Sequence, residues 1–166
     1  NGLALAALVF GIDQLVKWLV TGPLEIDTLG DVMPILPFFD LRFTTNFGIS
    51  LGLFEAESVE QRWMLVAGTA VIALIVLLWM LRERARGDIL GLGLILGGAL
   101  GNILDRVLYG YVIDYADLHI GTFRPFMIFN VADAAITIGV LIILARSFFL
   151  REKDTDDDMQ LAAKES

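Results

Sequence analysis

Residues 63–81 form an apolar run of 19 residues that contains no charged side chain. At about 1.5 Å of rise per residue, a helix of this length nearly crosses the roughly 30 Å hydrocarbon core of a bilayer. Trp63 and Trp79 stand near the two ends of the run, where the indole ring favours the membrane interface. The run therefore predicts a membrane-spanning helix.

Further apolar stretches accompany this run. Hydrophobic residues occupy 57% of the 166 positions, above the roughly 45–50% of an ordinary soluble domain. Because the excess is gathered into long runs, we expect an all-α membrane protein with one domain, residues 1–150. The predicted membrane helices are 3–20, 63–81, 89–108 and 129–150. The polar residues 151–166, with their run of aspartates, are expected to form a disordered cytoplasmic tail.

The loop between the second and third predicted helices indicates the orientation. Residues 82–88 read RERARGD, and positive residues gather in short cytoplasmic loops. Counting crossings from this loop puts both termini in the cytoplasm. It also puts residues 21–61 and 109–127 on the outer side, and we expect the second of these segments to be a short polar loop or helix.

The first outer segment, 21–61, contains three prolines, which rule out one continuous helix. From Phe39 to Thr44, apolar and polar residues alternate, and this period of two indicates a short strand. A turn at Asn46 and Gly48 follows. We therefore expect a small extramembrane β-sheet that lies on the membrane surface, with an ordinary loop as the alternative.

Small and charged residues recur along the predicted helices at helical spacing. Gly93, Gly97 and Gly101 are four residues apart, which allows a neighbouring helix to approach closely. Asp13 and Lys17 are also four apart, with the acid first, the more favourable order for an ion pair. This pair is interpreted either as a structural contact near the membrane surface or as part of a site.

Two carboxylates are the main candidates for chemistry. Asp114 lies just beyond the third predicted helix, and Asp133 lies near the start of the fourth, so both map to the outer side. Charged residues beside membrane helices are costly, and a functional site is the default hypothesis for them. Two close carboxylates share a proton, so that one activates water while the other polarises a carbonyl. The alternative is that Asp133 caps its helix, where negative charge contributes about 0.3–1 kcal/mol.

The residues present argue against several other chemistries. The absence of cysteine excludes disulfides, thiolate zinc sites and a cysteine nucleophile. The single histidine, His119, and four serines form no nucleophile-elbow pattern, so a Ser–His triad is not expected. There is no HExxH motif and no phosphate-binding loop. The net charge of −8, without a basic patch, gives no indication of nucleic-acid binding.

Alternatives from other functional classes stay open at this point. One is a small ion-coupled membrane transporter that uses its acids as a relay through the bilayer. Another is a hard-metal site for Mg²⁺ or Ca²⁺ built from Asp114, Asp117 and Asp133. The third is a purely structural, non-catalytic helix-bundle partner in the membrane.

Five motifs carry a resemblance to a known family. In chain order they are DQLVK at 13–17, TNFGISLGLF at 45–54, GGALGNILDR at 97–106, VIDYAD at 112–117 and FNVADAAITIGV at 129–140. Together they resemble the motifs of lipoprotein signal peptidase, also called signal peptidase II. The order GN-x-x-DR, V-x-D and FN-x-AD between two membrane helices makes this resemblance specific.

The resemblance implies an aspartic endopeptidase of the bacterial inner membrane. That family removes the signal peptide from prolipoproteins and cuts before a cysteine that carries diacylglyceryl. Its catalytic aspartates match Asp114 and Asp133. Its substrate-binding or supporting positions match Asn46, Gly48, Asn102, Arg106 and Asn130, with Asp13, Lys17 and Asp105 in more structural roles.

The resemblance also implies which partners to expect. The substrate would be a lipidated prolipoprotein, held in contact with membrane lipid at the periplasmic face. Globomycin-type inhibitors would occupy the same site. No metal or other cofactor is implied, and a monomer is expected.

Overall fold

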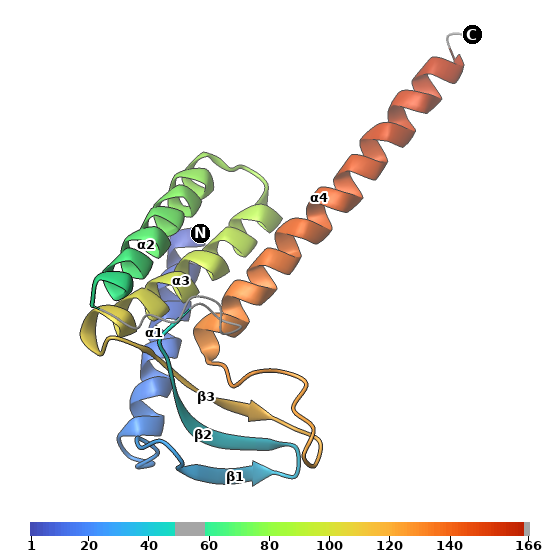
Figure 1. Cartoon of the computed structure of the whole chain (residues 1–166). Coiled ribbons are helices and arrows are strands. Elements are labelled where there is room, and N and C mark those ends of the chain that lie inside the picture. Colours follow the sequence, from blue (N-terminus) through green and yellow to red (C-terminus); the bar gives the residue numbers. More distant parts are fainter. Residues whose placement is uncertain (49–58, 165–166) are drawn as a thin grey trace.

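The structure is a computed structural model that describes the backbone of residues 1–48 and 59–164 and the side chains of residues 1–48 and 59–148. Within these residues, four helices stand beside one another and a three-stranded sheet lies across one end of them (Figure 1). The elements in chain order are α1 (Gly2–Thr21), β1 (Val32–Leu36), β2 (Phe39–Asn46), α2 (Val59–Arg82), α3 (Arg86–Leu108), β3 (Val112–Leu118) and α4 (Val131–Lys164).

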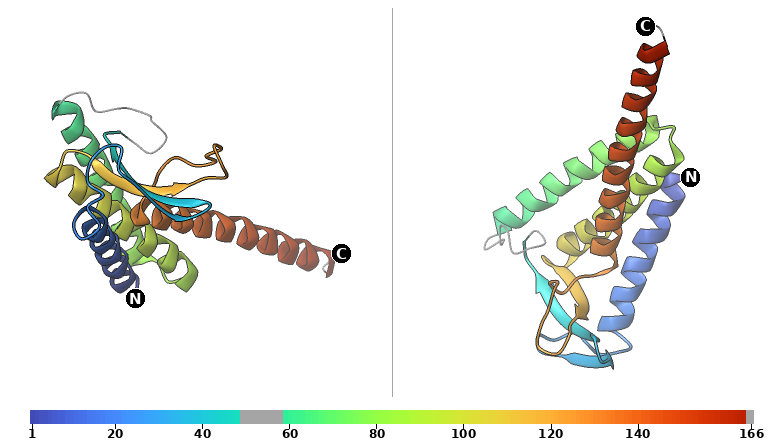
Figure 2. Two further views of the ribbon diagram at one scale, coloured as in Figure 1. Left: turned by 90° about the horizontal axis from the view of Figure 1, so that it is seen from below. Right: turned by 90° about the vertical axis from the view of Figure 1, so that its right-hand side faces the viewer.

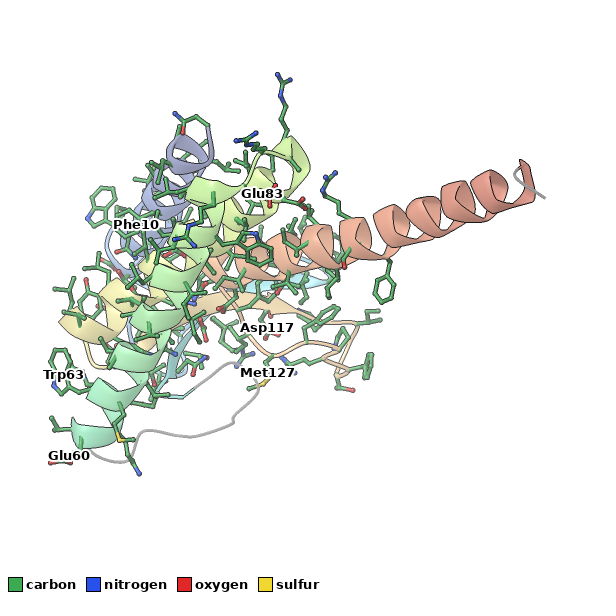
Figure 3. The ribbon with its side chains drawn as sticks, turned by 90° about the horizontal axis from the view of Figure 1, so that it is seen from above. Phe10, Glu60, Trp63, Glu83, Asp117 and Met127 are labelled. Atoms are coloured by element: carbon green, nitrogen blue, oxygen red, sulfur yellow. The ribbon has the colours of Figure 1, made fainter. Side chains whose placement is uncertain are left out.

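The predicted transmembrane helices are confirmed. Four helices in the described part of the chain are long and apolar enough to cross a membrane: Gly2–Thr21, Val59–Arg82, Arg86–Leu108 and the Val131–Phe148 part of α4. Their outward faces are apolar, and the side chains of Ile72 and Leu141 are 58% and 59% exposed. Trp63, near the sheet end of α2, lies at the outer edge of the molecule in Figure 3 and is 49% exposed.

Helix α4 differs from its prediction at both ends. It begins at Val131 rather than at 129, and it continues as helix to Lys164. The sequence predicted a disordered tail from 151, whereas the backbone of residues 151–164 is helical. This stretch contains neither proline nor glycine. Every residue in it therefore keeps its backbone N–H donor, and no helix-breaking residue interrupts the helix.

Helix α3 is the central element, because it packs against α1, α2 and α4. Its predicted small-residue face meets α1. A Cβ atom added to Gly97 would lie 2.5 Å from the carbonyl oxygen of Ala6, and one added to Gly101 would lie 2.5 Å from Asp13 Oδ2. Gly93 faces the backbone of α1 in the same way. The prediction of close helix approach is therefore confirmed, and α1 is the partner.

The extramembrane sheet has the strand order β1-β2-β3, with both pairs antiparallel. The strand predicted around 39–44 is confirmed as β2. In contrast, the expectation of a polar loop or helix in 109–127 is wrong for 112–118, because these residues form β3. Nearly every residue of β3 is buried, on both faces of the sheet. A strand covered on both faces has no alternation of apolar and polar residues, so its sequence does not show a period of two.

The strands run across the ends of the helices rather than along them (Figures 1 and 2). Helix α1 reaches the sheet, where Val20 packs with Ile26, Phe43 and Ile113 in a buried apolar cluster. Residues 49–58 lie outside the described part of the chain. They include 49–54 of the second family motif, so what the sequence predicts for this stretch stays a prediction.

Candidate active site

The predicted site residues gather where the sheet meets the helix ends. Asp114 lies in the middle of β3, opposite Thr44 of β2, and only 2% of its surface is exposed. Asp133 lies in the first turn of α4 and is partly exposed. The two carboxylates therefore come from different elements, and the path of the chain between β3 and α4 brings them into one site.

Two asparagines connect these carboxylates. Asn130 Nδ2 donates to Asp114 Oδ1 at 2.7 Å, and Asn102 Nδ2 donates to Asp133 Oδ1 at 2.8 Å. The amides also bond to each other, because Asn130 Nδ2 lies 3.2 Å from Asn102 Oδ1. One oxygen of each aspartate is thus bonded by one of these two amides, and the two amides are held together.

Asn130 and Asp133 also cap the start of α4. Asn130 Oδ1 accepts a hydrogen bond from the backbone N–H of Asp133 at 2.8 Å. In return, Asp133 Oδ2 lies 3.4 Å from the backbone nitrogen of Asn130. This reciprocal arrangement is that of a capping box. The capping role offered as an alternative is therefore present, but it engages one carboxylate oxygen while the other faces Asn102.

The turn after β2 contributes the predicted residues Asn46 and Gly48. Asn46 Nδ2 donates to Asp114 Oδ2 at 3.1 Å, and Asn46 Oδ1 accepts from the Gly48 backbone N–H at 3.1 Å. The side chain of Arg106 reaches from α3 and donates Nη2 to the carbonyl oxygen of Gly48. Arg106 therefore ties the turn to α3, and Asn46 ties it to the site.

A buried charge cluster lies beside the asparagines. Lys17 Nζ is 2.8 Å from Asp13 Oδ2 and 2.7 Å from Asp105 Oδ2, and no member of this trio is more than 3% exposed. Lys17 Nζ also donates to Asn102 Oδ1 at 3.4 Å. The predicted pair of Asp13 and Lys17 is confirmed, and Asp105 is its third member. The ammonium faces the Asn102 carbonyl oxygen, which leaves the amide nitrogen directed at Asp133.

Asp13 and Asp105 also accept hydrogen bonds from the backbone of α4 and β3, the two elements that carry Asp133 and Asp114. Asp13 Oδ1 accepts from the N–H of Ala132 at 2.9 Å, in the first turn of α4. Asp105 Oδ2 accepts from the N–H of Ile113 at 3.1 Å, in β3. Gln14, which sequence reasoning did not select, donates Nε2 to Asp105 Oδ1 at 3.0 Å. One cluster thus joins α1 and α3 to the chain on either side of the site.

Sequence reasoning also missed Arg62, in the first turns of α2. Its Nε donates to the carbonyl oxygen of Arg106 at 2.8 Å, and its Nη2 donates to that of Val107 at 2.7 Å. These carbonyls belong to the last turn of α3, where the Arg106 carbonyl oxygen also accepts the backbone N–H of Gly110 at 3.2 Å, so Arg62 adds a side-chain cap to this helix end. The available signal was a cation directly before a charge-free helix, at the end where α3 also terminates.

Asp117, the third member of the alternative metal site, is directed elsewhere. It follows Asp114 by three positions in β3 and therefore lies on the opposite face of the sheet. Its Oδ2 accepts from Arg42 Nε at 2.9 Å, and its Oδ1 accepts from Arg124 Nε at 3.0 Å. Among the described residues, no group of three His, Cys, Asp or Glu side chains could hold a metal ion.

Burial changes the protonation of Asp114. The pKa of its carboxyl is raised from an ordinary value of 3.8 to about 7, first because burial penalises the charged form and second because the Asp133 carboxylate is near. Hydrogen bonds from Asn46 and Asn130 and the charge of Lys17 act in the opposite direction. Near neutral pH, Asp114 can therefore retain a proton.

This shift predicts a pH dependence of stability. Because the folded state binds the Asp114 proton more tightly than the unfolded state, the contribution of this group is complete below about pH 4 and is lost as the pH rises through about 7. The melting temperature in detergent is expected to fall less between about pH 5 and pH 8 for Asp114→Asn than for the parent chain. Identical pH slopes for the two proteins would contradict the raised pKa.

The chain that carries these two aspartates and their asparagine partners is similar to known proteins. The family model described as signal peptidase (SPase) II matches residues 5–149. The chain belongs to the signal peptidase II family. It is 56% identical over 152 residues to the lipoprotein signal peptidase of Sphingopyxis alaskensis, covering 92% of this chain and 87% of that relative. Identity to the lipoprotein signal peptidase of Rhizorhabdus wittichii is 52% over 151 residues, with 91% and 87% covered.

Solved structures agree with this family membership. A bacterial membrane enzyme solved by the in meso method at 2.3 Å resolution superposes with a TM-score of 0.77 at 26% identity, covering 93% of this chain and 90% of that chain. A second, solved at 1.9 Å, gives a TM-score of 0.73 at 27% identity, with 87% and 90% covered. This signal peptidase II is thus an aspartic-type peptidase and a multi-pass bacterial membrane protein whose function is signal-peptide cleavage of prolipoproteins.

Proposed function

We propose that Asp114 and Asp133 are the catalytic dyad of this signal peptidase II, and that it cuts the peptide bond before a diacylglyceryl-modified cysteine. The observation that supports this role is the pair of bonded amides, Asn102 and Asn130, which hold one oxygen of each carboxylate. Carboxylates that share one environment and one proton are the arrangement used for acid–base hydrolysis of peptides.

The proposed mechanism gives the two aspartates different roles. Asp114, with its raised pKa, carries the shared proton and donates it to the oxygen of the scissile carbonyl as water adds. Asp133, which is partly exposed, takes a proton from water as the oxygen of that water adds to the carbonyl carbon. The tetrahedral intermediate then collapses: the C–N bond breaks, the new amine of the cysteine receives a proton from Asp133, and Asp114 recovers its own. The dyad is restored without an external acid or base.

The remaining predicted residues hold this arrangement. Asn46 and Asn130 donate to the two oxygens of Asp114, which limits its rotation. Arg106 holds the Gly48 turn beside the site. The trio of Lys17, Asp13 and Asp105 supports the dyad indirectly. It orients Asn102 and holds the backbone next to Asp133 and Asp114.

The location of the site at one end of the helices suits a substrate that is embedded in lipid. We infer an inner-membrane protein with cytoplasmic termini and a periplasmic site, since the arginine-rich loop 82–88 lies at the opposite end from the sheet (Figure 1). The acyl chains of the substrate would lie against the apolar helix faces. The protein acts as a monomer, and globomycin-type inhibitors compete for the dyad.

A relay through the bilayer is not favoured by this geometry. Among the described residues, the buried polar side chains of the helices gather at the sheet end, and α2 contains no charged residue between Trp63 and Leu81. A transporter needs titratable groups along a path from one side to the other.

A gel-shift assay tests the proposed function. Purified protein in detergent is mixed with a diacylglyceryl-modified prolipoprotein, with and without globomycin, and the Asp114→Asn variant is run alongside. We expect cleavage by the parent protein alone, blocked by globomycin. The unlipidated prolipoprotein serves as the control and should stay intact. Cleavage by Asp114→Asn at the parental rate would contradict the dyad, and cleavage of the unlipidated control would contradict the lipid requirement.

A further inference from the structure

The far end of the sheet exposes a cluster of large apolar side chains. We call this cluster the strand-tip patch; its members come from the last residue of β1, the β1–β2 turn and the loop after β3. They are 47–73% exposed: Leu36, Phe38, Ile120, Phe123, Phe126 and Met127. The two loops are joined, because the backbone N–H of His119 donates to the carbonyl oxygen of Phe38 at 3.0 Å. The backbones of the two loops that contribute the patch residues therefore meet at the same end of the sheet.

Polar side chains at this end of the sheet are directed at one another. Arg124, from the same loop as the exposed phenylalanines, folds back so that its Nε lies 3.0 Å and 3.1 Å from the two oxygens of Asp117. Arg42 donates to the same carboxylate, which is 1% exposed. His119 Nε2 lies 3.2 Å from Asp40 Oδ2. Arg124 itself is 42% exposed, but its charge is paired with the buried Asp117 carboxylate, whereas the large apolar side chains of the same loop are exposed without apolar cover.

The patch is located where a bilayer would begin. The ends of the strands project sideways past the helices, beside the first turns of α4 (Figures 1 and 2). Met127 precedes the start of α4 by only four positions, and the span Val131–Phe148 is apolar enough to cross a membrane. The patch is thus continuous along the chain with a lipid-facing helix, on which Ile138 is 52% exposed.

We propose that the strand-tip patch inserts into the boundary between headgroups and acyl chains, in the leaflet at the sheet end of the helices. Aromatic and aliphatic side chains favour this zone, and burying them there anchors an element that does not span the membrane. The sheet is then attached to the bilayer at both ends, through the helices and through the patch. This attachment holds β2 and β3, with Asn46 and Asp114, at a constant height above the lipid.

The absence of cysteine makes the insertion directly measurable. Single cysteines are introduced by Phe123→Cys and Ile120→Cys in the patch, Thr28→Cys as an exposed outer-loop reference, and Leu141→Cys as a lipid-facing reference. Each is labelled with a nitroxide, and the protein is reconstituted in vesicles of phosphatidylethanolamine and phosphatidylglycerol. We expect both patch labels to be accessible to oxygen and shielded from a water-soluble nickel complex, as at Leu141 and unlike at Thr28.

The other results would each overturn the proposal. Nickel accessibility at both patch sites equal to that at Thr28 would mean that the patch faces water. Shielding from both oxygen and nickel would mean that a second protein copy, rather than lipid, covers it. The measurement uses no substrate, so its outcome does not depend on the proposed catalytic dyad.

If the patch holds the sheet at a constant height above the lipid, its loss should change the KM for lipidated substrate. This second test rests on the proposed function, because it measures cleavage. The double variant Phe123→Ser/Phe126→Ser is compared with Leu29→Ser, which removes an exposed leucine from a different outer loop. We expect the double variant to raise the KM for lipidated substrate in vesicles about 3- to 10-fold, with kcat unchanged, and the Leu29 variant to match the parent. Equal KM values for all three proteins would overturn the role of the patch in positioning the sheet.

Discussion

Replacing Asp133 with asparagine is expected to abolish cleavage of the lipidated prolipoprotein and to leave the protein folded. Asparagine has nearly the same shape and can still accept the hydrogen bond that Asn102 Nδ2 donates to Asp133 Oδ1 at 2.8 Å. It cannot take a proton from water, so turnover should fall by at least about 10³-fold. The gel-shift assay measures turnover, and thermal unfolding in the same detergent measures the fold.

The matched control is Asp88→Asn, which alters an aspartate at the opposite end of the same helices. Asp88 Oδ1 pairs with Arg146 Nε at 2.7 Å, and both side chains are partly exposed. Loss of such a pair changes stability by about 0–1 kcal/mol and should leave turnover within about 2-fold of the parent. Retained turnover in Asp133→Asn would rule out the dyad.

Replacing Lys17 with methionine is expected to cause the largest loss of stability. Methionine fills a similar volume but removes the cation between Asp13 and Asp105, whose oxygens lie 2.8 Å and 2.7 Å from Lys17 Nζ. Two buried carboxylates without their counter-charge cost about 3–5 kcal/mol. The free energy of unfolding, measured by denaturant titration in detergent, should fall by that amount.

Arg146→Met is the control for this substitution, because it also removes a cation from an ion pair. The Arg146 and Asp88 side chains are 33% and 19% exposed, so solvent screens their charges. The expected loss is about 0–1 kcal/mol. Equal losses for Lys17→Met and Arg146→Met would show that burial of the trio does not increase its energetic contribution.

The sequence predicted the four membrane helices because each feature it used is local. Length, apolar composition and the charge-free run 63–81 depend only on neighbouring positions, and they define the spans within a few residues. The strand at 39–44 was also predictable, since β2 is half-buried and its residues alternate between apolar and polar types. In contrast, β3 has no local signal, because it is buried on both faces.

The candidate site was predictable only in part. The five motifs identified Asn46, Asn102 and Asn130 as residues of interest, but spacing along the chain does not show which amide contacts which carboxylate. Arg62 and Gln14 were missed for the same reason. Their partners, the carbonyl oxygen of Arg106 and the carboxylate of Asp105, lie far away in the sequence.

The amino-acid sequence by itself determined the class of protein, the four membrane spans, the family and the two aspartates that best fit its chemistry. Tertiary structure alone decided how those aspartates are held: Asn130 contacts both, and Asn102 is oriented by Lys17 from α1. It also decided that Asp117 pairs with two arginines instead of joining the site. The physical reason is that spans follow from local hydrophobicity, whereas hydrogen bonds and ion pairs depend on which distant segments the packed helices and sheet bring within 3 Å or so of one another.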